Sequence, residues 1–374
     1  MTTEFVFPDQ YESLLNTKIQ TTQALFTDFD MPEPQIFESE KSHYRMRCEF
    51  KIWHESDQSY YAMHKPGEKN SAFTIDSFPV ASALINKAMP LLLAEINDND
   101  MLRRRLFQVE FLSTQIDELL ITLIYHKRLE SDWQQEALAL RERLRGLVTE
   151  KLDFIGRSRG QKLNLDRDFV YEQLIVNDKS YRYQQLEGGF TQPNAKICEK
   201  MLAWAVKTSA NFAGNSDLLE LYCGNGNFTL PLAQNFNKVL ATEIAKTSVA
   251  AAHHNIDINK VNNITIARLS AEELVQALSG EREFRRLREI DLNEYNFGCI
   301  FVDPPRAGLD SATEQFCSQF DHILYISCNP ETLSENLKSL TQTHTIEKFA
   351  LFDQFPYTDH IESGVYLKRK ENSN

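Results

Sequence analysis

The sequence lacks the marks of several protein classes. Its six cysteines form no CxxC pair and no Cys/His ligand spacing, which argues against a zinc site or an iron–sulfur cluster. The longest apolar stretches, such as Pro90 to Ala94, are far shorter than the roughly 20 residues that a membrane helix needs. Met1 to Leu15 contains acidic residues and no basic residue, the reverse of a signal peptide. We therefore expect a reduced, cytoplasmic protein without a bound metal.

Acidic residues outnumber basic residues by 53 to 40, and the formal net charge is −13. A general positive field cannot hold this chain on nucleic acid, so any such contact must be local. Three local basic clusters exist, each of which is either a solvated face or a contact surface: Lys41, Arg45, Arg47 and Lys51; Arg103, Arg104 and Arg105; Arg157, Arg159 and Lys162.

A length of 374 residues allows two domains, and no internal repeat is present. Residues Glu12 to Phe26 predict an opening helix, which Met31 to Pro34 interrupts. The following region mixes alternating, strand-like runs with helical patterns, which is typical of an α+β domain. The strand-like runs are Tyr44 to Trp53, Phe107 to Phe111 and Leu119 to Tyr125, and the helical patterns are Ala81 to Ala94 and Trp133 to Leu147.

The second half of the chain alternates apolar strands with helical stretches. The strands are Leu218 to Tyr222, Val239 to Thr242, Ile264 to Arg268, Cys299 to Val302 and Ile323 to Ser327. This rhythm predicts a doubly wound α/β domain with a mostly parallel sheet. We place the boundary near residue 185, in the polar stretch Asn177 to Gly189, which gives domains 1–185 and 186–374. The opening helical segment of about 30 residues is expected to pack on the second domain.

A glycine loop follows the first of these strands. Gly224 and Gly226 allow the backbone to turn tightly and to approach a ligand. The next strand ends in Glu243, 19 residues after Gly224, where such folds bind ribose hydroxyls. The third glycine of the dinucleotide fingerprint is absent and Glu220 precedes the loop, so a nucleoside ligand is favoured over a pyrophosphate. Alternatively, the two carboxylates are helix caps or solvated groups, and Tyr222 is a core aromatic residue.

Two further strand ends carry reactive groups. Asp303 ends one strand and is followed by Pro-Pro-Arg306, where amine methyltransferases with a similar motif carry an aromatic residue, so N-methylation is disfavoured. Cys328 ends the next strand before Asn329-Pro330, a helix-start pattern. A helix N-terminus and a cation such as Arg306 lower the pKa of a thiol, which makes Cys328 a candidate nucleophile. The other five cysteines are expected to be buried structural residues.

A thiol that adds to a ring must later leave, and this elimination needs a base. His360 and Glu362 both lie in an expected loop between the two last strands. Their spacing alone does not choose between them, and either could be a solvated charge.

Together these motifs resemble the bacterial tRNA (uracil-5-)-methyltransferase family. The resemblance is carried in order by Phe190 to Asn194, Leu221 to Phe228, Phe301 to Arg306, Ile326 to Pro330 and His360 to Glu362, and by Ser42 to Arg47 and Asp76 to Pro79 in the first half. It implies a Rossmann-like methyltransferase domain, dependent on S-adenosyl-L-methionine, with an N-terminal α+β RNA-binding domain. It also implies that Cys328 is the nucleophile and Glu362 the base, with cofactor contacts from Gln192, Tyr222, Asn227, Glu243 and Asp303.

The implied substrate is the T-loop uridine of tRNA, which would become m5U54 (ribothymidine), and a similar loop in tmRNA is a further possibility. Related enzymes that act on ribosomal RNA carry an extra barrel and a cysteine-ligated cluster, and Cys48 is the only cysteine before Cys198. Candidates for RNA contact are Phe107 with Arg103 to Arg105, His126 and the Tyr44 to Lys51 strand. The alternatives left open are an rRNA target, an N-methyltransferase and an RNA-folding protein. No obligate protein partner is indicated.

Overall fold

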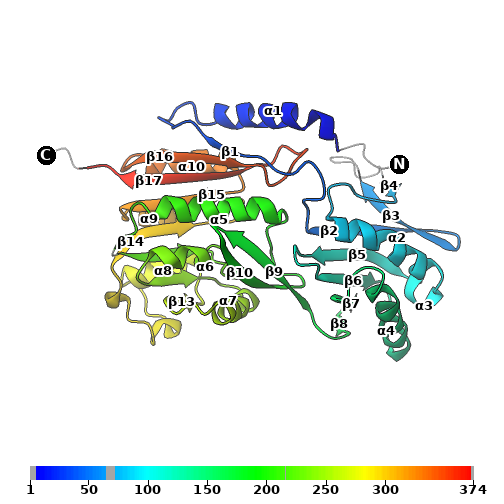
Figure 1. Cartoon of the computed structure of the whole chain (residues 1–374). Coiled ribbons are helices and arrows are strands. Elements are labelled where there is room, and N and C mark those ends of the chain that lie inside the picture. Colours follow the sequence, from blue (N-terminus) through cyan, green and yellow to red (C-terminus); the bar gives the residue numbers. More distant parts are fainter. Residues whose placement is uncertain (1–5, 65–71, 215, 372–374) are drawn as a thin grey trace. The chain divides into compact units, whose positions relative to one another are not determined.

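The computed structural model describes residues 6–64, 72–214 and 216–371 (Figure 1), and the chain divides into two compact units. The first unit contains Glu40–Gln173, Gln184–Ala195 and the chain up to Asp9, and the second contains Gln10–Ser39, Leu174–Tyr183 and Lys196–Asn374. A single boundary near residue 185 therefore does not describe the division. The early segment Gln10–Ser39 belongs to the second unit, and the chain passes between the units several times.

The first unit is built on a seven-stranded sheet. Its strand order is β4 (Ala72–Ile75), β3 (Gln58–His64), β2 (Arg47–Glu55), β5 (Leu106–Ser113), β6 (Leu119–Tyr125), β7 (Leu152–Ser158) and β8 (Gln161–Asn164). Only β6 and β7 pair in parallel, because helix α4 (Ser131–Arg145) connects them; the other pairs are antiparallel. This sheet, together with α2 (Ala83–Asn97), α3 (Asp100–Arg103) and α4, confirms the α+β pattern.

Alternation along β2 explains how the sheet buries one face. Cys48, Phe50 and Ile52 are buried, whereas Glu49 and Lys51 between them are exposed. The buried residues join one apolar core with residues of α2 and α4, among them Ile85, Leu92, Trp133 and Leu140. The opposite face of the strand stays polar, which leaves its charged side chains available for other contacts.

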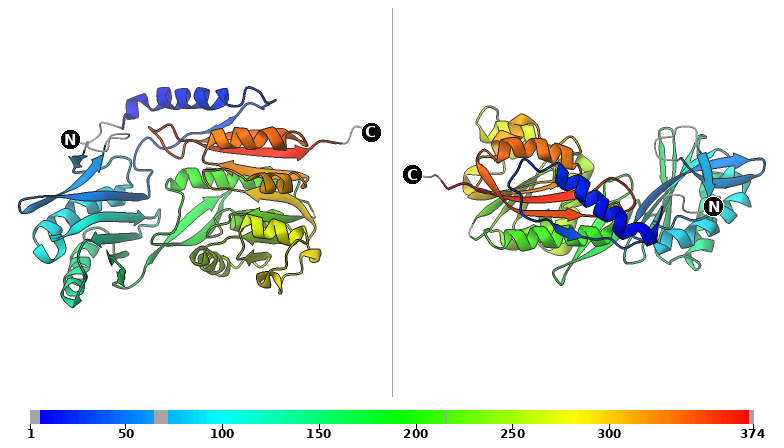
Figure 2. Two further views of the ribbon diagram at one scale, coloured as in Figure 1. Left: turned by 180° about the vertical axis from the view of Figure 1, so that it is seen from behind. Right: turned by 90° about the horizontal axis from the view of Figure 1, so that it is seen from above.

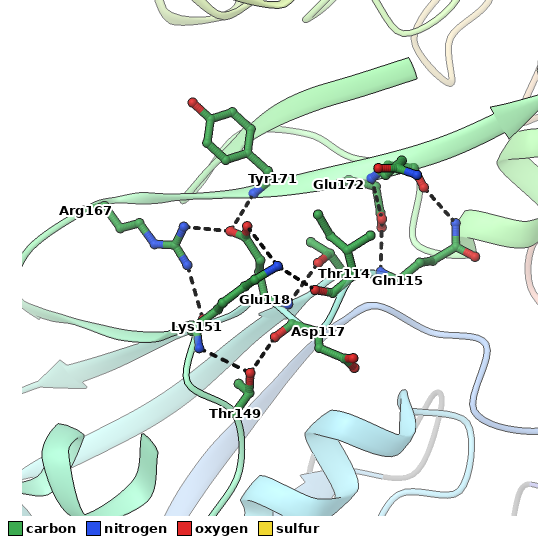
Figure 3. Close-up of polar contacts among 11 residues, drawn as sticks. Thr114, Gln115, Asp117, Glu118, Thr149, Lys151, Arg167, Tyr171 and Glu172 are labelled. Carbon is green, nitrogen blue, oxygen red and sulfur yellow. Dashed lines mark hydrogen bonds and ion pairs between the residues drawn. The ribbon is translucent and has the colours of Figure 1, made fainter. Parts of the chain in front are cut away.

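A buried carboxylate joins two segments of the first unit (Figure 3). Glu118, only 3% exposed, accepts hydrogen bonds from Nη1 of Arg167 (2.6 Å) and from the backbone N of Tyr171 (2.9 Å). The side chain of Glu172 accepts another from the backbone N of Gln115 (2.9 Å). These bonds fix the start of β9 (Phe169–Val176) to the turn between β5 and β6.

Strands β9 and β10 (Lys179–Leu186) form a separate hairpin. Its turn is Asn177-Asp178, and both residues have positive φ (47° and 66°), which suits a two-residue hairpin turn. The stretch 177–189, where the boundary was predicted, contains a change of unit between Tyr183 and Gln184, and most of it forms the strand β10. Its side chains are polar because much of the strand is exposed, as the burial pattern of β10 shows.

The second unit contains an eight-stranded sheet. Its strand order is β1 (Gln35–Phe37), β16 (His344–Phe352), β17 (Glu362–Arg369), β15 (His322–Ser327), β14 (Phe297–Val302), β11 (Asp217–Leu221), β12 (Val239–Thr242) and β13 (Ile264–Ala267). Only β17 runs antiparallel to its neighbours. The predicted doubly wound, mostly parallel sheet is therefore confirmed.

Helices lie on both sides of this sheet. They are α1 (Tyr11–Ala24), α5 (Ala195–Ser209), α6 (Thr229–Leu232), α7 (Lys246–Asn259), α8 (Ala271–Leu278), α9 (Ser311–Cys317) and α10 (Pro330–Leu340). Helices α10 and α5 lie on opposite sides, and α1 lies beside α10 (Figure 2). No helix within the described residues is both long and apolar enough to cross a membrane.

The strand order reverses at β11. After β11 the chain continues to β12 on one side, and later returns to β14 on the other side of β11. Ligands of open α/β sheets bind at such a reversal, outside the carboxyl ends of the strands. Because β17 is antiparallel, its first residue lies at the same edge as the last residues of β15.

Candidate active site

The loop after β11 turns sharply. Tyr222 has a φ of 61°, and Gly224 and Gly226 have φ values of 56° and 84°. Glycine adopts this left-handed region without strain, whereas a tyrosine there is unusual and marks a constrained position. A Cβ atom built on Gly224 would meet no atom within 4 Å, so there is open space in front of the loop. The strand predicted to reach Tyr222 ends at Leu221.

Glu243, at the end of β12, reaches this loop. One carboxylate oxygen accepts a hydrogen bond from the backbone N of Gly224 (3.1 Å), and the other accepts one from the backbone N of Ala245 (2.7 Å). The carboxylate is thus held beside the glycine loop, as its distance of 19 residues from Gly224 in the sequence predicted. Each oxygen keeps a lone pair for a hydroxyl donor.

Three residues that the sequence did not single out hold the same loop. The Tyr183 hydroxyl donates to the carbonyl of Asn227 (2.9 Å), and the side chain of Asn255 donates to the carbonyl of Asn225 (3.0 Å). The Sγ of Cys198 lies 3.4 Å from Nδ2 of Asn227. Sequence gives no signal for these contacts, because the partners come from a hairpin and two helices far along the chain.

Asp303, Cys328 and Glu362 lie at the ends of three neighbouring strands. Asp303 follows β14, Cys328 follows β15, and Glu362 is the first residue of β17. The expectation that Glu362 lies in a loop was wrong: it pairs with Phe352 in the sheet and is only 3% exposed. The reversed strand therefore brings a buried carboxyl group beside the thiol.

Cys328 immediately precedes the cap of α10. As predicted, Asn329 is the N-cap, accepting a hydrogen bond from the backbone N of Glu331 (3.2 Å), and Pro330 occupies the first turn. Nδ2 of Asn329 also donates to the carbonyl of Arg306 (3.2 Å), which ties this turn to the Pro-Pro-Arg loop. Cys328 is partly exposed, whereas the other five cysteines are buried, as predicted.

The pKa of Cys328 differs from the prediction. Burial, followed by the charges of Glu362 and Asp303, raises this pKa to about 11, and the charge of Arg306 lowers it less. The expected lowering by the helix N-terminus and Arg306 is therefore overturned. Burial also raises the pKa of Glu362 and of Glu220 to about 8 and that of Asp303 to about 7. The site disfavours accumulated negative charge.

His360 and Glu362 occupy different surroundings. Glu362 is buried, and its charge acts on Cys328. His360 is exposed, and its Nδ1 lies 3.5 Å from Nη2 of Arg306. This geometry favours Glu362 as the group that serves Cys328. Gln192, the remaining expected site residue, belongs to the first unit, and its role stays a prediction.

The doubly wound sheet and the glycine loop at its reversal point define a Rossmann-like fold, and the family model that matches the chain makes it a methyltransferase. The sequence model of the tRNA (uracil-5-)-methyltransferase family matches residues 10–370. The chain belongs to this family, and the resemblance seen in its motifs is confirmed.

Relatives of this chain align over nearly all of its length. A Vibrio parahaemolyticus protein named tRNA/tmRNA (uracil-C(5))-methyltransferase is 52% identical over 372 residues, covering 99% of this chain and 100% of the relative. A protein of the same name from Teredinibacter turnerae is 54% identical over 364 residues, covering 97% and 98%.

A solved structure shares the fold. It is the Pyrococcus abyssi tRNA (uracil-54, C5)-methyltransferase in complex with S-adenosyl-L-homocysteine, with a TM-score of 0.69 and 19% identity. The match covers 96% of this chain and 83% of the other.

Proposed function

We propose that this protein transfers a methyl group from S-adenosyl-L-methionine to carbon 5 of the T-loop uridine of tRNA, and of the similar loop in tmRNA. The observation that carries the proposal is the meeting of a partly exposed thiol, Cys328, with the buried carboxyl group of Glu362 at neighbouring strand ends. The names of the relatives support the substrate, and a tRNA substrate favours a cytoplasmic location.

The described residues fit the methyl donor. Open space in front of Gly224, the aromatic side chain of Tyr222 and the held carboxylate of Glu243 suit a nucleoside with ribose hydroxyls. When bound, S-adenosyl-L-methionine supplies an electrophilic methyl group on a sulfonium sulfur. The residues proposed to hold it are Gln192, Tyr222, Asn227, Glu243 and Asp303.

The chemistry then falls to two side chains. The Cys328 thiolate adds to carbon 6 of the uracil ring, and the enolate that forms places electron density on carbon 5. Carbon 5 takes the methyl group as the bond from that group to sulfur breaks. Glu362 removes the proton from carbon 5, the bond from carbon 6 to Sγ breaks, and the thiolate is restored.

The raised pKa values of the buried carboxyl groups suit this mechanism. The pKa of Glu362, about 8, is close to neutral pH, and a general base is most effective when its pKa lies near the operating pH. Because burial and nearby carboxylates raise the pKa of Cys328, formation of the thiolate is favoured when Asp303 and Glu362 are protonated.

A surface of the first unit is the proposed site for RNA bases and phosphates. The rings of Phe107 and His126 stack with centroids 4.2 Å apart, and Nζ of Lys51 lies 4.1 Å from the centre of the Phe107 ring. Beside His126 lies a pocket of about 500 Å³ whose lining includes Arg104 and Arg105. Unstacked RNA bases bind aromatic faces, and guanidinium groups bind phosphates.

The test uses Glu362→Gln with tRNA and S-adenosyl-L-methionine. Without a base, methyl transfer can proceed but elimination cannot, so a covalent protein–RNA species should accumulate on a denaturing gel. Methylated tRNA release should fall by about 100-fold or more, the usual contribution of a general base.

The control is the double variant Cys328→Ala/Glu362→Gln, which should form no covalent species. Cys328→Ala alone should bind the cofactor and tRNA with unchanged affinity and produce no 5-methyluridine. Turnover by Cys328→Ala would refute the nucleophile, and absence of the band with Glu362→Gln would move the base elsewhere, with His360 first.

A further inference from the structure

Helix α1 places a lysine on its buried face. Its buried residues are Tyr11, Leu15, Lys18 and Thr22, which lie on one side of the helix. Lys18 is only 8% exposed, and a buried ammonium group is costly unless charge pairing and hydrogen bonds compensate it. A lysine in this stripe therefore calls for a specific partner.

The ammonium group of Lys18 has three partners in one loop. Nζ lies 2.6 Å from Oδ1 of Asp353, 3.0 Å from the carbonyl oxygen of Phe355 and 3.1 Å from that of His360. Lysine has three N–H donors, so these contacts use its full capacity. Asp353 is itself 1% exposed, and the pair is thus a buried ion pair.

These partners lie at both ends of the loop that precedes Glu362. Asp353 follows directly on β16, and His360 stands two residues before Glu362 at the start of β17. The backbone N of Asp353 also donates to the carbonyl of Phe37 (3.0 Å), the last residue of β1. The ring of Tyr357 meets Tyr11 edge to face, with centroids 6.0 Å apart. The segment Gln10–Ser39 therefore holds the loop at several points.

The same helix also reaches the element that follows Cys328. The Ser334 hydroxyl, on α10, donates to the carbonyl of Leu25 at the C-terminal end of α1 (2.9 Å). Helix α1 thus contacts both elements of the proposed site. Lys18 binds the loop before Glu362, and the carbonyl of Leu25 binds Ser334 on α10.

We propose that Lys18 is a positioning residue that sets the place of Glu362 relative to Cys328 through the loop 353–361. The inference rests on the proposed function. A buried ion pair adds little net stability compared with apolar residues of similar volume, so its contribution here is geometric. Because Lys18 ties both loop ends, its loss releases the residues just before Glu362, while Cys328 stays at the start of α10.

The test measures adduct and turnover in Lys18→Met and in Lys18→Met/Asp353→Asn. The double variant removes both buried charges, so it decides the question if the single variant fails to fold. We expect turnover to fall by about 10- to 100-fold, as for a slight misplacement of a catalytic group. The fraction of enzyme in the covalent RNA adduct should rise, because elimination is slowed more than addition. Affinity for S-adenosyl-L-homocysteine should stay within about 2-fold.

Lys238→Met is the matched control, because it makes the same change at an exposed lysine of the same unit that pairs with Glu294 (3.3 Å), and it should leave the adduct fraction unchanged. A purely structural role of Lys18 predicts that turnover and adduct fall together, and this result would overturn the proposal. So would wild-type behaviour of a folded variant.

Glu362→Gln is measured alongside to separate the two proposals. If Glu362→Gln gives no adduct, the proposed mechanism fails. If Glu362→Gln gives adduct but the Lys18 variants do not, only the role of Lys18 fails.

Discussion

Three carboxyl groups near the strand ends have raised pKa values. Burial raises the pKa of Glu220 and Glu362 to about 8 and that of Asp303 to about 7. An oxygen of Glu220 has no hydrogen-bond partner among the described residues. A carboxylate in this position is costly to ionise, so the folded protein holds protons that the unfolded chain releases.

Stability should therefore depend on pH in a defined direction. Because these pKa values are raised, the stabilising effect of the bound protons is complete below the ordinary pKa of about 4.3 and is lost as pH rises to about 8. The free energy of unfolding should fall between pH 6 and pH 9. Glu220→Gln should reduce this fall by about 2–3 kcal/mol, as measured by urea denaturation at both pH values. Glu272→Gln, at an exposed residue of α8, is the control; an equal effect from it would contradict the assignment.

At the scale of elements, the loop from β14 to α9 depends on one glycine. Gly308 has a φ of 77°, and a Cβ atom there would lie 2.7 Å from Oδ1 of Asn336 and 3.1 Å from Cβ of Thr332. Both neighbours are on α10, and Asn336 holds the loop through the backbone N of Leu309 (3.0 Å). A side chain at Gly308 would push this loop away from the helix whose start carries Cys328.

Gly308→Ala should therefore impair both stability and catalysis. Gly160 has a similar φ of 74° but open space around it, so Gly160→Ala measures backbone strain alone, about 1–2 kcal/mol. Gly308→Ala should lower the unfolding temperature more than Gly160→Ala does. It should also lower kcat, whereas Gly160→Ala should leave kcat unchanged. Equal losses in the two variants would show that the contact with α10 is unimportant.

Sequence patterns predicted the strands whose side chains are apolar on both faces of the sheet. The runs Val239 to Thr242 and Ile323 to Ser327 correspond to β12 and the body of β15 because buried parallel strands have an unbroken apolar signal. The strand β10 was missed because its exposed positions are polar, and Glu362 was assigned to a loop because a buried carboxyl group looks like a solvated one in sequence. Lys18 was missed because a lysine on a helix that carries several polar residues looks like a solvated one in sequence.

At the scale of the whole molecule, negative charge dominates. The net charge is −13, and the pocket beside His126 in the first unit is lined by four basic residues, Arg104, Arg105, Lys127 and Arg128, and by three acidic ones, Asp100, Glu130 and Asp132. Each phosphate contact with RNA releases counterions and steepens the salt dependence of binding. An acidic protein with few such contacts should bind tRNA with a shallow salt dependence.

Arg104→Ala/Arg105→Ala tests this arrangement. Loss of two phosphate contacts should weaken tRNA binding and reduce the slope of log affinity against log salt by about 1.5–2. Fluorescence anisotropy at several salt concentrations gives the slope. Arg143→Ala is the matched control, because Arg143 is paired with Glu95 (2.7 Å) on the helical side of the unit. A slope equal to that of the wild type would remove the pocket from the RNA surface.

The attachment of α1 to the loop before β17 has a consequence for synthesis of the chain. Lys18 and Asp353 are 335 positions apart, so the helix leaves the ribosome long before its partner is made. At roughly 5–20 residues per second, this interval lasts on the order of tens of seconds. During this interval the buried face of α1 stays exposed, because β16 and β17 have not yet been synthesised. The second unit can close only when translation is almost complete, and a chain that stops early cannot assemble the strand that begins with Glu362.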